Sequence, residues 1–479
     1  MDQIRDNKKH KAGADFLAHD LHLRTDWRIN KNQHLSLTGL YAKDDYDFAD
    51  RYTEESFDEN YGIKNKLLAL NYRYHPKNGT SINAHLSQSK FSSSLDLISE
   101  STFLFPTTLE GYYTNYKAWA EQSQSLKTTK ISLYATQSLA NNMSLSYGAE
   151  KEWLTYKDKQ EFNIYSGNTA GTQFSDNKLS TSLVAAFAEF SFKPAKRLQV
   201  NTGLRLTSYE DSEEILLDPK LSLQYALNQE ARLTAGFSIN SQPIVPIAQI
   251  DKGRISESHL LADPNFPAAV SNQWSIGFFH AKPRFFDQIA IEAYYKTQKQ
   301  VSKYAFFHTD QTTERIEHLL SFVDGEMKAY GLEILLQKSI QQLSTSLSYT
   351  YSKAETSFPK INGGDFFDAD FSKNHHFNAL FIYQFPKGYR LSASWTYQSG
   401  NPIHFGIIDA KTSARHHLDL HVERRWNAKK RGTNWFGLGI YNVYNQSTVF
   451  SQLADHLPGR MNWFGHSKMI PHFYVGMQR

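Results

Sequence analysis

The chain has 479 residues, no cysteine and a formal net charge of +4. The absence of cysteine excludes disulfides, thiolate catalysis and thiolate-bound zinc. The small net charge, without a basic stripe, excludes the electrostatic footprint of a nucleic-acid-binding protein. No run of about 18 apolar residues occurs, so the sequence predicts no membrane-spanning helix.

Most of the sequence consists of long segments in which apolar and polar residues alternate. Leu198, Val200 and Leu204 share one face of such a segment, whereas Gln199 and Arg205 share the other. These segments run to about ten residues or more, which exceeds the five or six typical of soluble sheets and suits the nine to eleven of a tilted membrane strand. The pattern predicts an all-β fold, a transmembrane antiparallel β-barrel.

Nineteen strands are predicted in chain order, each to within a few residues. They lie at about 16–29, 33–48, 60–76, 80–92, 127–138, 143–158, 180–194, 198–212, 216–227, 230–242, 270–282, 287–302, 327–339, 343–355, 373–385, 389–401, 413–427, 434–446 and 469–478.

Short and long connections alternate between these strands. The short ones carry the residues that tight turns favour and are expected at the periplasmic end: Asn30-Lys31-Asn32, Lys77-Asn78-Gly79, Ala140-Asn141-Asn142, Asn228-Gln229 and Pro386-Lys387-Gly388. The long ones are expected to face outward and to fold over a ligand: 49–59, 93–126, 159–179, 243–269, 303–326, 356–372, 402–412 and 447–468.

The whole chain, 1–479, is expected to be one outer-membrane barrel domain, because no linker or shift in composition divides it. Its aromatic content of 14% suits the girdles that flank a barrel's apolar band. The charged segment Met1–His10 lacks the apolar core of an export signal. If the chain ends in the periplasm, an odd number of strands is missing from the N-terminus of an even-stranded barrel.

Several motifs, in order over residues 216–479, resemble the TonB-dependent outer-membrane receptors of Gram-negative bacteria. The motifs are Leu217-Asp-Pro-Lys-Leu-Ser-Leu-Gln-Tyr225, Tyr330-Gly-Leu-Glu-Ile334, Leu347-Ser-Tyr-Thr-Tyr-Ser352, Phe371–His376, Trp395-Thr-Tyr-Gln-Ser-Gly-Asn-Pro402 and Tyr441-Asn-Val-Tyr-Asn445. One departure is the C-terminal Arg479, since the family usually ends in an aromatic residue that the barrel-assembly machinery reads.

The resemblance implies a barrel of about 22 strands, of which this chain supplies about 19, closed by an N-terminal plug that is absent here. It implies import of a scarce ligand, a siderophore, vitamin, glycan or peptide, across the outer membrane. The implied partners are outer-membrane lipid, the TonB complex acting through the missing plug region, the ligand at the extracellular loops and the barrel-assembly machinery, with no nucleic acid and no cofactor.

Four residues of the polar face are predicted to project into the lumen, where a ligand path or a plug contact needs polar groups: Glu333, Asp419, His421 and Glu423. The alternative is that they only bond the plug or one another. A second set supplies the hard oxygen ligands that calcium prefers, although an ordinary solvated loop has the same composition: Asp44, Asp45, Asp47 and Asp50.

Two histidine pairs, His375-His376 and His416-His417, are not expected to chelate a metal, because neighbours on a strand point to opposite faces. No phosphate loop, nucleophile elbow or His-Glu-x-x-His motif occurs, so the chain is not expected to be an enzyme. Three alternatives to a receptor stay open: a plugless, porin-like passive channel, a non-transporting remnant, and a surface protein built on a soluble β-sandwich.

Overall fold

The computed structural model describes residues 11–51, 55–76, 79–105, 112–166, 169–210, 212, 214–251, 254–262, 267–308, 318–359, 362–405, 408–428, 432–446, 451–454, 461–464 and 469–478. These residues form an antiparallel sheet of 20 strands and three separate two-stranded hairpins. No helix in this part of the chain is long and apolar enough to cross a membrane.

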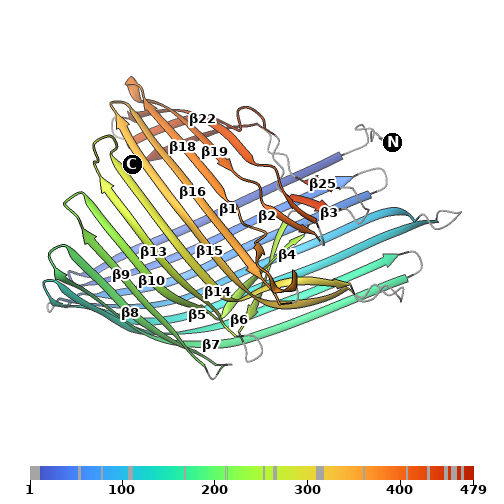
Figure 1. Ribbon diagram of the computed structural model, residues 1–479, viewed down its shortest axis with the longest axis horizontal. Coiled ribbons are helices and arrows are strands. Elements are labelled where there is room, and N and C mark those ends of the chain that lie inside the picture. The colour runs from blue at the N-terminus through green and yellow to red at the C-terminus, as the bar shows by residue number, and fades with distance from the viewer. Residues whose placement is uncertain are drawn as a thin grey trace. The chain divides into compact units, whose positions relative to one another are not determined.

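The chain divides into two compact units, the first comprising Met1–Phe190 with Arg205–Leu216 and the second comprising the rest. In the first unit six consecutive strands pair antiparallel with their chain neighbours (Figure 1). They are β1 (Lys11–Asn30), β2 (Gln33–Arg51), β3 (Glu55–Tyr74), β4 (Thr80–Phe105), β5 (Tyr112–Ala140) and β6 (Met143–Ser166). Two further strands, β7 (Thr169–Ala195) and β8 (Leu198–Tyr209), run through both units.

The second unit pairs its long strands in chain order as well. They are β9 (Ile215–Ala226), β10 (Ala231–Gln242), β13 (Ala269–Ala281), β14 (Gln288–His308), β15 (His318–Ile340), β16 (Leu343–Ser357), β18 (His375–Gln384), β19 (Tyr389–Gln398), β22 (Arg415–Ala428), β23 (Gly432–Tyr441) and β26 (Ile470–Gln478). Figure 1 shows β13 to β19 as neighbouring ribbons, from green to orange.

Short elements occupy several of the connections. In the second unit the 3-10 turn η2 (Asn362–Gly364) and the two-residue strand β17 (Phe367–Asp368) lie in a long connection, whereas the 3-10 turn η3 (Pro386–Gly388) forms a short one. The three hairpins pair β11 (Ile244–Asp251) with β12 (Arg254–Leu261), β20 (Pro402–Phe405) with β21 (Ile408–Lys411), and β24 (Ser451–Ala454) with β25 (Met461–Phe464).

All 19 predicted strands are confirmed, because the 20-stranded sheet without the two-residue β17 contains one strand at each predicted place. Their predicted ends are wrong in several cases. The predicted connection 93–126 is largely strand, since β4 continues to Phe105 and β5 begins at Tyr112. Here Ser92, Ser93 and Ser94 put small polar residues on both faces, so the alternation disappears while the backbone pairing continues.

Tight turns form where the sequence predicts them, at 31–32, 141–142 and 386–388, while 77–78 lies outside the described residues. In the first turn the Asn30 side chain accepts a hydrogen bond of 2.9 Å from the Asn32 amide. In the last turn Gly388 has φ 79°, and a β carbon there would clash with the backbone oxygen of Arg425. Only glycine fits this turn without strain.

The two faces of each strand differ in character, as the alternation predicts. In β13 the large apolar side chains Trp274 and Ile276 are exposed, with Ile276 at 62%, and the intervening Ser275 lies on the opposite face. The same holds in the first unit, where Leu21 and Leu23 of β1 are both exposed. Exposed apolar rows of this kind suit contact with lipid, and we call the other side of each strand the polar face.

The difference between the faces predicts opposite outcomes for one substitution at two positions of β13. Ile276→Arg places a charge in the apolar row and is expected to destabilise the protein in lipid by about 2–4 kcal/mol if the position lies near the bilayer midplane. Gln273→Arg, on the polar face of the same strand, is the matched control and should cost little. Urea unfolding from lipid vesicles measures both, and equal costs would contradict a lipid-facing row.

Candidate functional site

Strand β22 carries three of the predicted site residues on its polar face, Asp419, His421 and Glu423, and pairs with β19 and β23, while β26 pairs with β23. The register places Glu423 opposite Arg390 of β19 and opposite Gly437 of β23, and Gly437 faces Tyr474 of β26. The side chains between these positions, Leu438 among them, are apolar and exposed on the other face. The pairing of the strands thus brings residues that are far apart in sequence into one cluster.

Glu423 is the centre of this cluster and is only 3% exposed. Its Oε1 accepts from Arg390, at 3.0 Å, and from Nε of Arg425, at 2.5 Å. Its Oε2 accepts from the hydroxyl of Tyr474 at 2.9 Å. Both oxygens of this buried carboxylate are therefore bonded, as a buried charge requires.

Aromatic rings extend the cluster across β23 and β26. The guanidinium carbon of Arg425 lies 5.7 Å from the centre of the Trp435 ring, which suits a cation–π contact. The Tyr474 ring lies directly against Gly437, where a β carbon would clash with it. Gly437 therefore makes room for the ring that bonds Glu423.

Asp419 lies on the same face but is not bonded to Glu423 or its partners. It bonds the backbone at the end of β23 instead. Its Oδ1 accepts from the backbone amide of Asn442 at 2.9 Å, and its Oδ2 lies 3.5 Å from Nε2 of His417. Asn442 is fully buried, has φ 53° and bonds the backbone of Gln446 through both its side-chain atoms. The Tyr441–Asn445 motif thus ends β23, and Asp419 fixes that end.

Glu333 is not part of the cluster. It lies exposed on β15 between Glu292 of β14 and Thr350 of β16, and the strands β16 and β18 separate β15 from β19. The structure therefore brings together Asp419, His421 and Glu423 on β22 and places Glu333 elsewhere, on β15.

The acidic residues predicted for a cation loop lie on a strand. β2 extends to Arg51, so Asp44, Asp45, Asp47 and Asp50 all fall within it, and neighbours such as Asp44 and Asp45 point to opposite faces. Asp45 also forms an ion pair with Lys43. Among the described residues, no group of three or more histidine, aspartate or glutamate side chains is placed to hold a metal ion.

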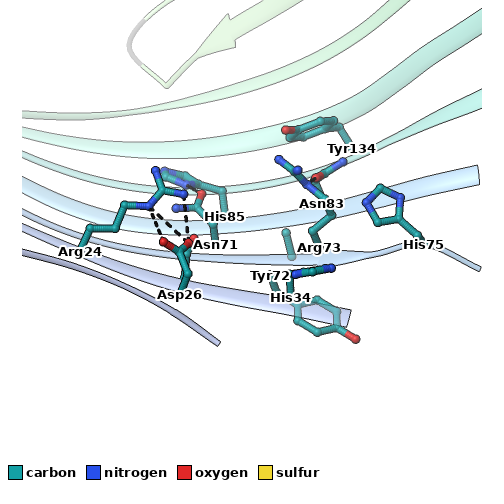
Figure 2. Close-up of a pocket in the computed structure, with 12 residues that line it drawn as sticks. Arg24, Asp26, His34, Asn71, Tyr72, Arg73, His75, Asn83, His85 and Tyr134 are labelled. Atoms are coloured by element: carbon teal, nitrogen blue, oxygen red, sulfur yellow. Dashed lines mark hydrogen bonds and ion pairs between the residues drawn. The ribbon is translucent and has the colours of Figure 1, made fainter. Parts of the chain in front are cut away.

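A pocket of about 380 Å³ lies in the first unit, lined by side chains of β1 to β5 (Figure 2). Figure 2 shows Arg24 and Asp26 joined on β1, with Nε 3.0 Å from Oδ2. Arg73 donates to Asn83 at 3.0 Å, and His85 bonds Asn71 at 2.5 Å. The pocket wall is thus polar and held by hydrogen bonds between strands.

Sequence reasoning missed this pocket, although a signal for it exists. Near the tight turns, successive strands carry polar residues at positions i and i+2, which lie on the same face of a strand. Arg24 with Asp26 and Asn83 with His85 are examples. The turns also touch, because the backbone amide of His75 donates to Asn32 at 2.8 Å.

A second carboxylate with two cationic partners, this one in the first unit and largely buried, was also missed. Glu150 of β6 forms ion pairs with Lys130 of β5, at 2.8 Å, and with Arg205 of β8. Its side chain is 11% exposed. It matches Glu423 in having two cationic partners from different strands.

The comparisons with known proteins point to one family. A family model described as "TonB dependent receptor-like, beta-barrel" matches residues 4–445. The chain belongs to this family of TonB-dependent receptors, which are outer-membrane β-barrels, so the predicted family and fold class are confirmed. Among curated proteins, no relative matches the sequence.

Solved structures share the fold at low sequence identity. The ferric-catecholate import receptor Fiu of E. coli K12 aligns with a TM-score of 0.64 and 12% identity over 97% of this chain and 80% of its own. BauA, the ferric preacinetobactin receptor of Acinetobacter baumannii, gives 0.60 and 13% over 98% and 79%. The ferric citrate transporter FecA gives 0.62 and 10% over 98% and 78%.

The environment of Glu423 predicts a large effect of its removal. Glu423→Ala leaves Arg390 and the Tyr474 hydroxyl without their shared acceptor and is expected to lower the free energy of unfolding by about 1–3 kcal/mol. Glu333→Ala is the control, because Glu333 is an exposed glutamate on another strand, β15. It should change the free energy of unfolding by no more than about 0.5 kcal/mol. Thermal unfolding in detergent gives both values, and an equal loss in the two variants would refute the role of the cluster.

Proposed function

We propose that this protein is an outer-membrane receptor of a Gram-negative bacterium that captures a scarce ligand and passes it inward with energy from the TonB complex. The family membership over residues 4–445 is the observation that carries the proposal. Among proteins of the same fold are the ferric-catecholate import receptor Fiu, the ferric citrate transporter FecA and the RagAB peptide importer. A siderophore, vitamin, glycan or peptide is the corresponding class of ligand here.

The lengths of the strands support capture at the outward end. β4 has 26 residues and β5 has 29, whereas about nine to eleven cross the hydrocarbon. Their surplus lies on the side away from the tight turns, so it extends the hairpin outward. Polar hairpins of this length offer a ligand a large surface made of paired, ordered backbone.

The polar face supports passage. Charged and hydrogen-bonding side chains such as Arg390, Glu423 and Tyr474 are held in place on it, while the apolar face is suited to lipid. A polar lining of this kind allows a hydrated ligand to pass a bilayer that would otherwise exclude it.

In this proposal residues 1–479 supply the barrel part of a larger receptor, and the plug and the TonB-contacting segment precede it, as the resemblance to the family implies. The chain then has outer-membrane lipid, the barrel-assembly machinery and the TonB complex as partners. The family consists of receptors and transporters, and we propose no enzymatic role for this member.

Uptake into the periplasm distinguishes energised import from a passive channel. The source bacterium, a strain lacking this gene and a strain lacking TonB are each given a radiolabelled ferric catecholate, ferric citrate or a labelled peptide mixture, and the label in the periplasmic extract is counted. For one of these probes, accumulation is expected to fall in both mutant strains.

The two alternatives to a receptor, a passive channel and a non-transporting remnant, predict different results in the same experiment. A porin-like channel predicts a loss in the strain lacking this gene but normal accumulation without TonB. A non-transporting remnant predicts no loss for any probe. A small sugar that enters through general porins is the control and should accumulate equally in all three strains.

A further inference from the structure

Two histidines that lie 51 residues apart in sequence meet on the polar face of the second unit. His421 of β22 and His472 of β26 both stand opposite Gly439 of the intervening strand β23. Nδ1 of His421 lies 3.3 Å from Nε2 of His472. The ring centres are 4.8 Å apart and the ring planes meet at 61°.

Gly439 is what allows the rings to converge. A β carbon at this position would clash with both imidazoles, and the flanking Leu438 and Ile440 are exposed on the apolar face. Any larger residue at 439 would push the two nitrogens apart. The lack of a side chain at Gly439 of β23 therefore leaves room for the two imidazole rings.

The separation of the nitrogens suits a shared metal ion. Two nitrogens, each about 2.0–2.1 Å from a tetrahedral metal, stand about 3.3–3.4 Å apart. The same two nitrogens are within reach of an N–H···N hydrogen bond when one of them carries a proton, and a metal ion would take the place of that proton. We propose that His421 and His472 bind a borderline divalent cation, Zn²⁺, Cu²⁺ or Ni²⁺, for which neutral imidazole is a preferred ligand.

The neighbouring carboxylates are bonded to other groups, so the two histidines are the protein ligands of this site. Glu423, two residues along β22, already accepts from Arg390 and Arg425. Asp419, two residues the other way, accepts from the backbone amide of Asn442. The remaining coordination positions are filled by water or by donor atoms of a metal-bearing ligand, so the ion is exchangeable rather than structural.

The histidines are accessible enough for such an ion, because both are partly exposed on the polar face. His472 lies near the outward end of β26, the end that follows a long connection, and His421 lies near the middle of β22. This inference goes beyond the proposed import function and does not depend on it. Metal binding is measured on the purified protein without TonB, so either proposal can fail alone.

Electron paramagnetic resonance with Cu²⁺ tests the site on the full chain in detergent. The wild-type protein is expected to bind one tightly held Cu²⁺ whose spectrum shows splitting from two imidazole nitrogens, and excess Zn²⁺ should displace it. His421→Ala and His472→Ala should each weaken binding at least about tenfold and remove one nitrogen from the spectrum. Gly439→Ala should weaken binding although every histidine is retained.

The control is His416→Ala, on the same strand but on the opposite face, where the ring bonds the Tyr444 hydroxyl at 2.7 Å. This variant should bind Cu²⁺ as the wild type does. A wild-type spectrum without two coupled nitrogens overturns the proposal by itself, even if a variant fails to fold. Equal binding by the wild type and all four variants also overturns it, because the ion would then sit on other histidines.

Discussion

Backbone hydrogen bonding between neighbouring strands is the constraint on which the rest of this structure depends. In hydrocarbon an unpaired N–H or C=O group costs several kcal/mol, so each strand that crosses a bilayer needs a neighbour that bonds it along its length. The antiparallel pairings from β1 to β6 and from β9 to β26 supply this. Once the backbone is paired, side chains must alternate between two faces, and each face takes on its own chemistry.

Ion pairs hold several side chains of the polar face in place. In each unit a largely buried carboxylate is held by two cationic side chains from two different strands, Glu150 in the first unit and Glu423 in the second. Glycines opposite aromatic rings complete the second cluster, at Gly437 and Gly439. Such a face keeps its side chains in fixed positions, which a passage for a polar ligand requires.

The strands could be predicted from the sequence because they follow from local alternation. Contacts between residues on different strands could not be predicted, because they depend on how the strands pair. All 19 long strands follow from the period of two, but the outward ends of β4 and β5 do not, because serine-rich segments pair without alternating. The alternation predicts that Asp419 lies on the polar face, but it gives no sign of the hydrogen bond to the Asn442 amide, which depends on how β23 ends. The His421–His472 contact spans 51 residues, and Gly439 between them gives no signal in the sequence.

The central claim is that one face of each strand contacts lipid and the other contacts water, and cysteine scanning of β22 tests it most directly. Because residues 1–479 contain no cysteine, each introduced thiol is the only one among them. Single cysteines at 417 to 422, labelled in intact outer membranes with a water-soluble maleimide, should react at 417, 419 and 421 and stay unlabelled at 418, 420 and 422. Equal labelling on both faces would contradict the account and favour a soluble sheet.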